Sequence, residues 1–509
     1  MALSYNKLWK LLIDKGINKT DLREKTNISQ STMAKLGKGE NVETSVLDRI
    51  CEALECDISD IVEYIKQTST KTIKFIDLFA GMGGTRIGFE RAAKELGFNT
   101  KCVLTSEIKP YAVEALKENF EQDNLQGDIT KIESSSIPDF DFLLGGFPCQ
   151  AFSTAGKGLG FIDTRGTLFF EIERILKEKK PFGFLLENVE GLVLHDRENN
   201  SDKIGRTLAT ILDRLTQLGY KVEWRLLDSQ YFGVAQSRYR VYIVGTLYEK
   251  VNLDDFEVSK KTVGEILETG LPCVNSHFTE CLFRHFKANE LFGKSIKDKR
   301  GGDNNIHSWT IGLKGEITKE QTEIIEKLFK ERRKKHWAQE IGIDWMDGMP
   351  LTLAQISTFH SSNNLKEMLD DLVKKGYLVM EHPKKIVYIE VNGAKIQQRV
   401  QDETKPLGYN IVSGKLSFEF TKILDNNNVA PTLVAMDVCK LGVVDGNGIR
   451  HLSIREGLRL FGYPDDYKLD MFPNSNKGLS QAFDLLGNTV VVPVIYNVSK
   501  RLLSTYDKK

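Results

Sequence analysis

This sequence of 509 residues lacks a long apolar run and a signal-peptide layout, and these absences exclude membrane-spanning and secreted proteins. No apolar run approaches the roughly 20 residues that a transmembrane helix needs. Lysines interrupt the apolar positions of the N-terminal stretch MALSYNKLWKLLIDKG, which does not have the layout of a signal peptide. We therefore expect a cytoplasmic protein that has no contact with a membrane.

Cysteine is scarce, and net charge is missing altogether. The seven cysteines form no CxxC pair, so their spacing predicts neither a disulfide framework nor a metal site. Reduced thiols fit the cytoplasm. The 70 basic residues are balanced by 70 acidic ones, so any binding of nucleic acid must rely on local basic patches and not on a globally basic chain.

Residues 1–67 carry helical spacing and helix caps in the order of a helix-turn-helix. Thr20 and Ser29 can each cap a short helix, and Asn27 turns the chain between them. The stretch resembles the Cro/repressor-type helix-turn-helix family, whose second helix enters the major groove. A small bundle that only packs or dimerises is the alternative. The DNA contacts that the resemblance implies are Gln30, Ser31, Thr32 and Lys35.

Residues 72–250 alternate short apolar strands with amphipathic helices, beginning with IKFIDLFA. This alternation predicts an α/β fold with a doubly wound, mostly parallel sheet and helices on both faces. Ligands bind such sheets at the carboxyl ends of the strands. The residues of interest fall at those ends: Gly81, Glu107, Asp128, Cys149 and Glu187.

The alternation stops over residues 251–430 and returns over residues 431–509, which we expect to complete the α/β domain. Within the middle segment, the order helix, helix, strand over 350–385 is typical of a small winged-helix-like module. The stretch KLFKERRKKHWAQ is a basic helix, which is either a solvated face or a nucleic-acid contact.

The glycines that follow the first strand suggest a nucleotide-like ligand. Gly81, Gly83 and Gly84 let the backbone turn tightly and approach a ligand closely. Their GxGG pattern differs from the GxGxxG dinucleotide fingerprint and suits a nucleoside without a pyrophosphate. Glu107 follows roughly 20 residues later, where an acid binds ribose hydroxyls, and Asp128 is placed to accept from an adenine amino group.

Cys149 is the one cysteine that follows a Gly-Gly-Phe-Pro turn, and Pro148 fixes the backbone before it. A thiolate is reactive only where its environment lowers the pKa. Glu187 ends the following strand, and alternation places Arg238 and Arg240 on one face of another. A nucleophile, an acid and two cations can therefore meet at one rim. A buried thiol, a surface carboxylate and solvated arginines fit the same pattern.

Several stretches together are similar to motifs of the DNA (cytosine-5)-methyltransferase family, in that family's order. They are DLFAGMGG, GGFPCQAFS, DTRGTLFFEIERIL, ENVEG, QSRYR, IREGLRLFGYPDDY and GNTVVVPV. The resemblance covers about residues 72–250 and 430–500. It implies a Rossmann-like methyltransferase sheet, S-adenosylmethionine as the methyl donor and double-stranded DNA as the substrate. Residues 251–430 then form a smaller target-recognition region.

The resemblance also implies a cofactor pocket. Phe79 contacts the adenine, Glu107 the ribose, and Asp128 with Ile129 the adenine edge. The complete implied set is Phe79, Gly81, Gly83, Gly84, Glu107, Ile108, Asp128, Ile129, Pro148, Asn488 and Val490.

The implied chemistry follows from the weak nucleophilicity of cytosine C5, which a thiolate added at C6 makes reactive. Cys149 makes this attack, Glu187 hydrogen-bonds or protonates N3, and Arg238 stabilises the developing charge and helps to place Cys149. Arg240 acts in the same way or supports the site. The base must flip out of the duplex, and we expect loop 150–166 to close over it. The resemblance implies DNA contacts by Gln150, Ser153, Gln236 and Thr432. It also makes a basic run a candidate for contacts to DNA phosphates: Lys330, Arg332, Arg333, Lys334 and Lys335.

Three readings remain open at this stage. DNA methylation in a restriction–modification system is the first, and RNA methylation of the compact tRNA type, which the long region 251–430 argues against, is the second. Transcription regulation by residues 1–67 is the third, and it can coexist with the first. The stretch GGDNNIHSWTIGLKG is similar to recognition regions for sites such as GGYRCC. We expect a monomer on its target and a cognate restriction endonuclease without stable contact.

Overall fold

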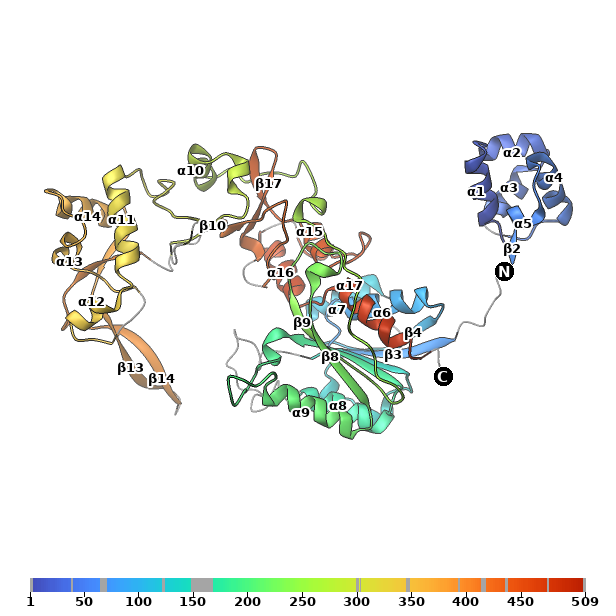
Figure 1. The fold of residues 1–509 in the computed structure, drawn as a ribbon, viewed down its shortest axis with the longest axis horizontal. Coiled ribbons are helices and arrows are strands. Elements are labelled where there is room, and N and C mark those ends of the chain that lie inside the picture. The colour runs from blue at the N-terminus through green and yellow to red at the C-terminus, as the bar shows by residue number, and fades with distance from the viewer. Residues whose placement is uncertain are drawn as a thin grey trace. The chain divides into compact units, whose positions relative to one another are not determined.

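The computed structural model describes most of the chain and divides it into two compact units. One unit is Met1–Ile73 with Gly97–Asn99, and the other is Lys74–Leu96 with Thr100–Lys509 (Figure 1). The described residues are 3–37, 40–64, 71–120, 124–147, 168–298, 302, 304–344, 348–391, 394–412, 418–434, 438–473 and 476–506.

The N-terminal unit is a helical domain with a core of its own. Its helices are α1 (Asn6–Asp14), α2 (Lys19–Thr26), α3 (Gln30–Gly37), α4 (Thr44–Leu54) and α5 (Ile58–Ile61), and β1 (Leu3–Ser4) pairs with β2 (Glu63–Tyr64). One apolar side chain from each helix is completely buried in the shared core: Leu8, Leu22, Leu36, Ile50 and Ile61.

The helix-turn-helix forms between α2 and α3, as predicted. Asn27 takes the left-handed conformation, with a φ of 49°, and so turns the chain. Ser29 Oγ accepts from the Thr32 amide at 3.1 Å and caps α3. The predicted cap of α2 was wrong. Asn18, not Thr20, accepts the hydrogen bonds at its start, and Thr20 lies inside the helix.

The second unit is built on a mixed seven-stranded sheet, which confirms the predicted α/β class. Five strands on one side of the sheet follow the predicted parallel pattern, since β4 pairs with β5, β3 with β6 and β6 with β7 in parallel. Two antiparallel strands close the other edge. The order is β5 (Leu125–Gln126), β4 (Asn99–Ser106), β3 (Thr72–Leu78), β6 (Phe142–Gly146), β7 (Gly183–Val189), β9 (Tyr239–Thr246), β8 (Lys221–Asp228).

Helices cover both faces of this sheet (Figure 1). On one face Ile76 and Leu78 pack in the core formed with α8 (Leu168–Lys179) and α9 (Arg206–Gln217). On the other face the ring of Phe75 lies 5.0 Å from that of Phe89, which belongs to α6 (Gly84–Glu95). Alternate side chains of β3 therefore pack against helices on opposite faces of the sheet. Helix α7 (Pro110–Asn119) joins β4 to β5.

The C-terminal helices return to this domain. Helix α17 (Val492–Leu503) packs along α6, and α16 (Asn476–Gly487) precedes it. Within the described part of the chain, the stretch Lys477–Leu503 is long and apolar enough to cross a membrane by length and composition alone. Its apolar side chains, such as Ile495 and Val498, are instead fully buried in the core. The composition thus reflects packing of two core helices.

Segments from either side of the middle region share a small five-stranded sheet. Phe278 of α10 (His277–His285) packs there with Ile296, Phe420 and Ile449. The order is β11 (Asn305–Ile306), β10 (Ser295–Ile296), β16 (Lys422–Ile423), β17 (Leu441–Asp445), β18 (Gly448–His451).

A module with winged-helix topology lies between β11 and β16. Its order is helix, helix, short strand, helix, helix, strand, hairpin, strand, with Leu351 bridged to Tyr409 as the short strand. The module is longer than the predicted 350–385. Its elements are α11 (Lys319–Glu331), α12 (Lys335–Glu340), α13 (Leu353–Ser357), α14 (Leu365–Lys374), β12 (Leu378–Glu381), β13 (Lys384–Val391), β14 (Ala394–Gln401) and β15 (Gly408–Ile411).

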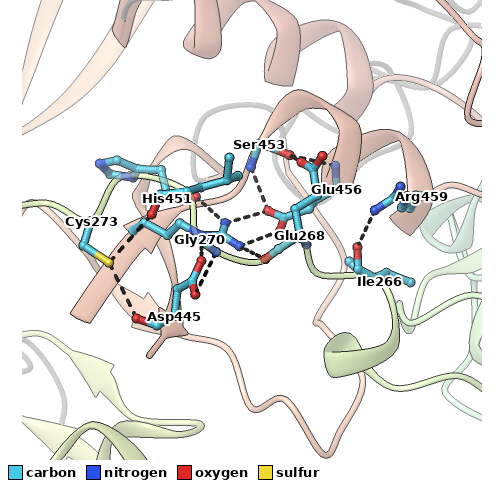
Figure 2. Close-up of polar contacts among 11 residues, drawn as sticks. Ile266, Glu268, Gly270, Cys273, Asp445, His451, Ser453, Glu456 and Arg459 are labelled. Carbon is cyan, nitrogen blue, oxygen red and sulfur yellow. Dashed lines mark hydrogen bonds and ion pairs between the residues drawn. The ribbon is translucent and has the colours of Figure 1, made fainter. Parts of the chain in front are cut away.

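A buried ionic network ties the segment around Glu268 to the small five-stranded sheet (Figure 2). Arg450 donates to both carboxylate oxygens of Glu456, at 2.9 and 2.8 Å, and to Asp445 at 2.7 Å. It also donates to the Glu268 carbonyl at 2.6 Å. Arg450 is only 2% exposed. Because loss of one partner of a buried pair costs roughly 3–5 kcal/mol, this network anchors residue 268 to β17, β18 and α15 (Ile454–Leu460).

Candidate active site

The rim of the large sheet brings Glu187 next to the end of β6. Gly146, the last residue of β6, pairs with Glu187 in β7. A Cβ on Gly146 would lie 3.5 Å from Glu187 Oε2. The side-chain amide of Asn188 donates to the Phe147 carbonyl at 3.2 Å and so fixes the chain as it leaves the strand.

Four predicted site residues follow directly and lie outside the described residues: Pro148, Cys149, Gln150 and Ser153. In the sequence Cys149 is three residues beyond Gly146, the residue that pairs with Glu187.

Glu187 forms a largely buried ion pair with Arg240. Arg240 Nε lies 3.1 Å from Glu187 Oε1, and the two side chains are 14% and 12% exposed. Burial raises the pKa of the Glu187 carboxyl, and the positive charges of Arg240 and Arg238 offset part of that effect. Glu187 therefore keeps its proton to a higher pH than an ordinary glutamate and is suited to hydrogen-bond or protonate a ring nitrogen.

The structure distinguishes the two arginines that the sequence treated as a pair. Arg238 is 3% exposed, and its guanidinium donates to the carbonyls of Leu433, Gly487 and Thr489 at 3.0, 2.9 and 3.2 Å. It thereby holds two distant segments against the start of β9. The sequence predicted that Arg238 and Arg240 share one face of a strand. Because β9 begins only at Tyr239, Arg238 lies before the strand and the alternation of side chains does not apply to it.

Gln236 is a correction to the predicted DNA contacts. Its side chain is completely buried. The amide donates to the Leu460 carbonyl at 3.0 Å and accepts from the Leu433 amide at 3.1 Å. These bonds commit both ends of the side chain to the protein. Thr432 is exposed and accessible, and its hydroxyl donates to the Ser237 carbonyl at 2.8 Å.

The glycines after β3 have two different functions. Gly81, with a φ of 54°, has no atom within 4 Å of the position of a Cβ, so its backbone faces open space. At Gly83 a Cβ would lie 2.4 Å from Phe120, and at Gly84 it would lie 2.5 Å from the Tyr463 hydroxyl. Only Gly81 is therefore open to a ligand, whereas Gly83 and Gly84 allow close packing within the protein.

Glu107 closes the turn from the neighbouring strand. Its Oε2 accepts from the Gly81 amide at 2.7 Å, and its Oε1 accepts from the amides of Ile108 and Lys109, both at 2.8 Å. A carboxylate offers about four acceptor positions, so about one remains for a ribose hydroxyl. Glu107 also borders a cavity of about 460 Å³ with Asn124, Gln126 and Gly127 among its lining residues.

Further residues around this turn test whether a nucleoside cofactor fits. The Ile108 side chain is 70% exposed, which is unusual for isoleucine and suits contact with a flat ring. Asp128 uses Oδ1 to bind Thr130, and these hydrogen bonds lower its pKa, so it stays charged. The ionised carboxylate, the open glycine and the exposed isoleucine fit S-adenosylmethionine.

The other predicted cofactor residues differ in how far their side chains are exposed to a ligand. Ile129 is 2% exposed, so only its backbone can meet a ligand, and Val490, at 9%, packs against Gly84. Asn488 is exposed and donates to the Asp484 carbonyl at 2.7 Å. Phe79 is half-buried beside the turn, with a φ of 56°.

Sequence reasoning missed Asp77. It is completely buried in β3, and among the described residues neither carboxylate oxygen has a hydrogen-bond partner. Burial raises its pKa to about 8, so it is largely protonated at neutral pH. A single acid within the apolar strand FIDLF was the available signal.

The other DNA candidates divide by exposure. On α3, Gln30, Ser31 and Lys35 are exposed, whereas Thr32 is half-buried with its hydroxyl 2.9 Å from that of Ser29. Arg332 is a correction to the predicted phosphate contacts, since it is 4% exposed and donates to the Asn410 side chain. Arg333 is half-buried. The exposed members of that run are Lys330, Lys334 and Lys335.

Comparisons with known proteins agree with this arrangement. The model for C-5 cytosine-specific DNA methylase matches residues 73–504, and the model for the Cro/C1-type HTH DNA-binding domain matches residues 7–67. The type II methyltransferase M.NlaIV of Neisseria lactamica is 59% identical over 433 residues, which are 85% of this chain and 99% of that protein. The type II methyltransferase M.BanI of Aneurinibacillus aneurinilyticus is 42% identical over 456 residues, 84% and 95% of the two chains.

A solved structure of the transcriptional regulator VanUg is 58% identical over 13% of this chain and 85% of that one, with a TM-score of 0.12. The family match and the relatives together decide the identity. The chain belongs to the C-5 cytosine-specific DNA methylase family: it is a DNA (cytosine-5)-methyltransferase that uses S-adenosylmethionine and carries an N-terminal helix-turn-helix domain of the Cro/C1 type.

Proposed function

We propose that the enzyme methylates cytosine at one specific duplex sequence through a covalent bond between Cys149 and C6. The observation that carries this proposal is the buried pair of Glu187 and Arg240 beside the end of β6. A carboxyl with a raised pKa pairs across the sheet with Gly146, which is three residues before the candidate nucleophile in the sequence. That combination suits addition of a thiolate to a base whose ring nitrogen takes up a proton.

Each side chain then has a defined part in the reaction. The Cys149 thiolate forms the S–C6 bond, and the electrons of the C5–C6 double bond move into an enamine as Glu187 donates a proton to N3. Arg240 holds Glu187 in place through Oε1 and leaves Oε2 facing Gly146. Bound S-adenosylmethionine would supply an electrophilic methyl group to C5 and leave as the neutral thioether. Loss of the C5 proton to solvent then breaks the S–C6 bond, restores the double bond and releases the thiolate, while N3 returns its proton to Glu187.

The cofactor would be held where Gly81 leaves open space and Glu107 retains an acceptor position. Asp128 and the exposed Ile108 would bind the adenine end. Val490 supports the turn from behind by packing against Gly84. The loop 150–166, which the sequence predicts to close over the flipped base, lies outside the described residues. Arg238 would act by holding the segments at 433 and 487–489 together.

The cellular role that we propose is protection of host DNA in a restriction–modification system, as the names of the two relatives indicate for those proteins. The enzyme would act in the cytoplasm as a monomer on its target. A cognate endonuclease would recognise the same sequence without stable contact.

Methylation in cells tests sequence specificity directly. Bisulfite sequencing of DNA from cells that express the full chain should show methylated cytosine within one recurring sequence, and we expect a degenerate, GC-rich six-base site such as GGYRCC. Cells that express Cys149→Ser provide the matched control and should show no methylation there. Methylated cytosines without a shared sequence would contradict the proposal.

A second candidate function, transcription regulation, is favoured by the exposed face of α3, which carries Gln30, Ser31 and Lys35. We propose that this face binds an operator near the enzyme's own gene. In the full chain, Gln30→Ala should weaken operator binding roughly 5- to 150-fold if it removes a base contact. Methyl transfer should not change.

Lys10→Ala is the control for Lys35→Ala in the same domain, because Lys10 is exposed on α1. Lys35→Ala should reduce the salt dependence of binding by about one phosphate contact. Lys10→Ala should leave it unchanged. Equal affinity for the operator and for unrelated DNA would rule out the regulatory role.

A further inference from the structure

The hairpin of the winged-helix module has the properties of a DNA-contacting element, and its helix α14 does not. We propose that β13 and β14 bind the duplex substrate with the face that carries Tyr388, Gln397 and Arg399. Figure 1 shows this hairpin projecting from the helices of its module. The hairpin would therefore supply part of the sequence readout of the methyltransferase.

The hairpin has exposed apolar side chains, and no other strand among the described residues pairs with it. β13 and β14 pair from Lys384 with Gln401 to Val391 with Ala394, and among the described strands neither pairs with any other. Tyr388 is 70% exposed and Ile386 44% on the face that also carries Gln397 and Arg399, and Ile389 is 38% exposed on the other face. A two-stranded hairpin is marginally stable alone in water, and clustered apolar exposure marks an interaction surface. The hairpin is thus a surface that needs a partner.

Residues that are paired across the two strands share a face. Tyr388 lies opposite Gln397, and Ile386 lies opposite Arg399. Gln397 and Arg399 are both exposed, and within the described residues Arg399 forms no ion pair. Arginine and glutamine are the side chains that bind guanine and adenine edges in pairs of hydrogen bonds. This face therefore combines base-reading groups with an aromatic ring.

The charge of the hairpin is complementary to DNA. The two strands contain Lys384, Lys385, Lys395 and Arg399, and their one acidic residue is Glu390. Ion pairs hold the two lysines at its base, Lys384 with Glu381 at 3.3 Å and Lys385 with Asp402 at 3.1 Å. These pairs brace the base of the hairpin, whereas Arg399 remains exposed on the same face as Ile386, its partner across the strands.

The helix that would occupy the groove in a helix-reading module is poorly suited to do so. On α14, Asp370 pairs with Lys366 at 2.6 Å, and Asp371 pairs with Lys375, just beyond the helix, at 2.7 Å. Asp370 also accepts from the Tyr409 hydroxyl at 2.8 Å, which holds its charge in place. With Glu367 also exposed, this helix presents as much negative as positive charge. Phosphates would be repelled by its carboxylates.

The dimensions also fit. Eight residues in each strand, at about 3.3 Å per residue, extend roughly 26 Å. The major groove is about 12 Å wide and admits a two-stranded ribbon. The hairpin can therefore lie in the groove over most of one helical turn, with one face towards the bases.

The test compares the hairpin with α14 in the full-length enzyme. Affinity is measured for a duplex that contains the methylated site and for an unrelated duplex of equal length, with Arg399→Ala and Gln397→Ala as variants. Each should weaken binding to the specific duplex roughly 10- to 100-fold and bring the two affinities closer together. Methyl transfer at saturating DNA and the KM for the cofactor should stay within about twofold.

Matched controls come from the same module. Lys374→Ala removes an exposed charge from α14, and Gln339→Ala removes an exposed amide from α12. Both should bind as the wild type does, and thermal unfolding of all four variants should agree. The proposal is overturned if Arg399→Ala and Gln397→Ala bind normally, or if Lys374→Ala loses as much affinity as Arg399→Ala.

A second variant separates DNA from a protein partner. Replacement of Tyr388 by Lys keeps the hairpin exposed and basic but removes the ring. Sedimentation of the wild type alone should show a monomer at every concentration, and Tyr388→Lys should reduce specificity for the target duplex. A wild-type dimer that Tyr388→Lys dissociates, with unchanged DNA affinity, would assign the hairpin to a second copy of the chain and overturn the proposal.

Discussion

Cys149→Ser is expected to lower methyl transfer to duplex DNA by at least about 1,000-fold, because a serine hydroxyl at neutral pH is a far weaker nucleophile than a thiolate. The substitution removes the addition to C6, on which the reactivity of C5 depends. Binding of the cofactor and of the target duplex should stay within about twofold, since serine keeps the shape of the side chain. Transfer of labelled methyl groups and equilibrium binding measure the two effects separately.

Cys273→Ser is the matched control, because Cys273 is a half-buried free thiol beside β17 and β18. It should retain nearly full activity. Substantial methyl transfer by Cys149→Ser would contradict the covalent mechanism. Loss of DNA or cofactor binding in parallel with activity would instead make Cys149 structural.

Glu187→Gln is expected to lower kcat by roughly 100- to 10,000-fold, the range of general acid catalysis. Glutamine keeps a hydrogen bond to N3 but cannot give up a proton at neutral pH. Because burial raises the pKa of Glu187, the proton donor is present below that pKa and is lost as the pH rises through it. The wild-type rate should therefore fall on the alkaline side, and Glu187→Gln should remove that dependence.

The alkaline fall also separates the two arginines. Arg240 and Arg238 both lower the pKa of Glu187, Arg240 more strongly, so Arg240→Ala should move the alkaline fall to higher pH, further than Arg238→Ala does, while it reduces kcat. Arg238→Ala should mainly reduce thermal stability, because it leaves three carbonyls without their donor. An unchanged alkaline fall in Glu187→Gln would show that another group supplies the proton.

The strand ends were predictable from the sequence because a period of two and flanking glycines fix where a strand stops. Glu107 and Glu187 were placed correctly at the rim for that reason, and so was Gly81. The same local signal could not tell Gly81 from Gly83 and Gly84. What distinguishes them is the packing of Phe120 and Tyr463, which come from other parts of the chain.

Side chains whose partners lie far along the chain were the ones misjudged. Arg332 belongs to a strongly basic run and was expected to meet phosphates, yet Asn410 binds it in the interior. Gln236 was expected at the DNA, but the carbonyl of Leu460 holds it. A basic or polar pattern predicts solvent contact only where no distant segment provides a partner, and the sequence does not show where the chain folds back.

The winged-helix module illustrates the same limit. The order helix, helix, strand and a glycine predicted the module at 350–385, whereas the pairing of β12 with β15 extends across the hairpin and is visible only in the fold. The hairpin itself alternates apolar and polar residues, which in a sheet would predict one buried face. Here Ile389, which lies on the more apolar face, is 38% exposed, so that face is not fully covered among the described residues.

The covalent bond between Cys149 and C6 is the central claim, and mass spectrometry of a trapped complex tests it most directly. A target duplex with 5-fluorocytosine at the methylated position carries no C5 proton to lose, so the S–C6 bond should persist after methyl transfer. Digestion of the complex should yield one modified peptide, with the base and the methyl group on Cys149. An adduct on another cysteine, or full turnover with no adduct, would contradict the account.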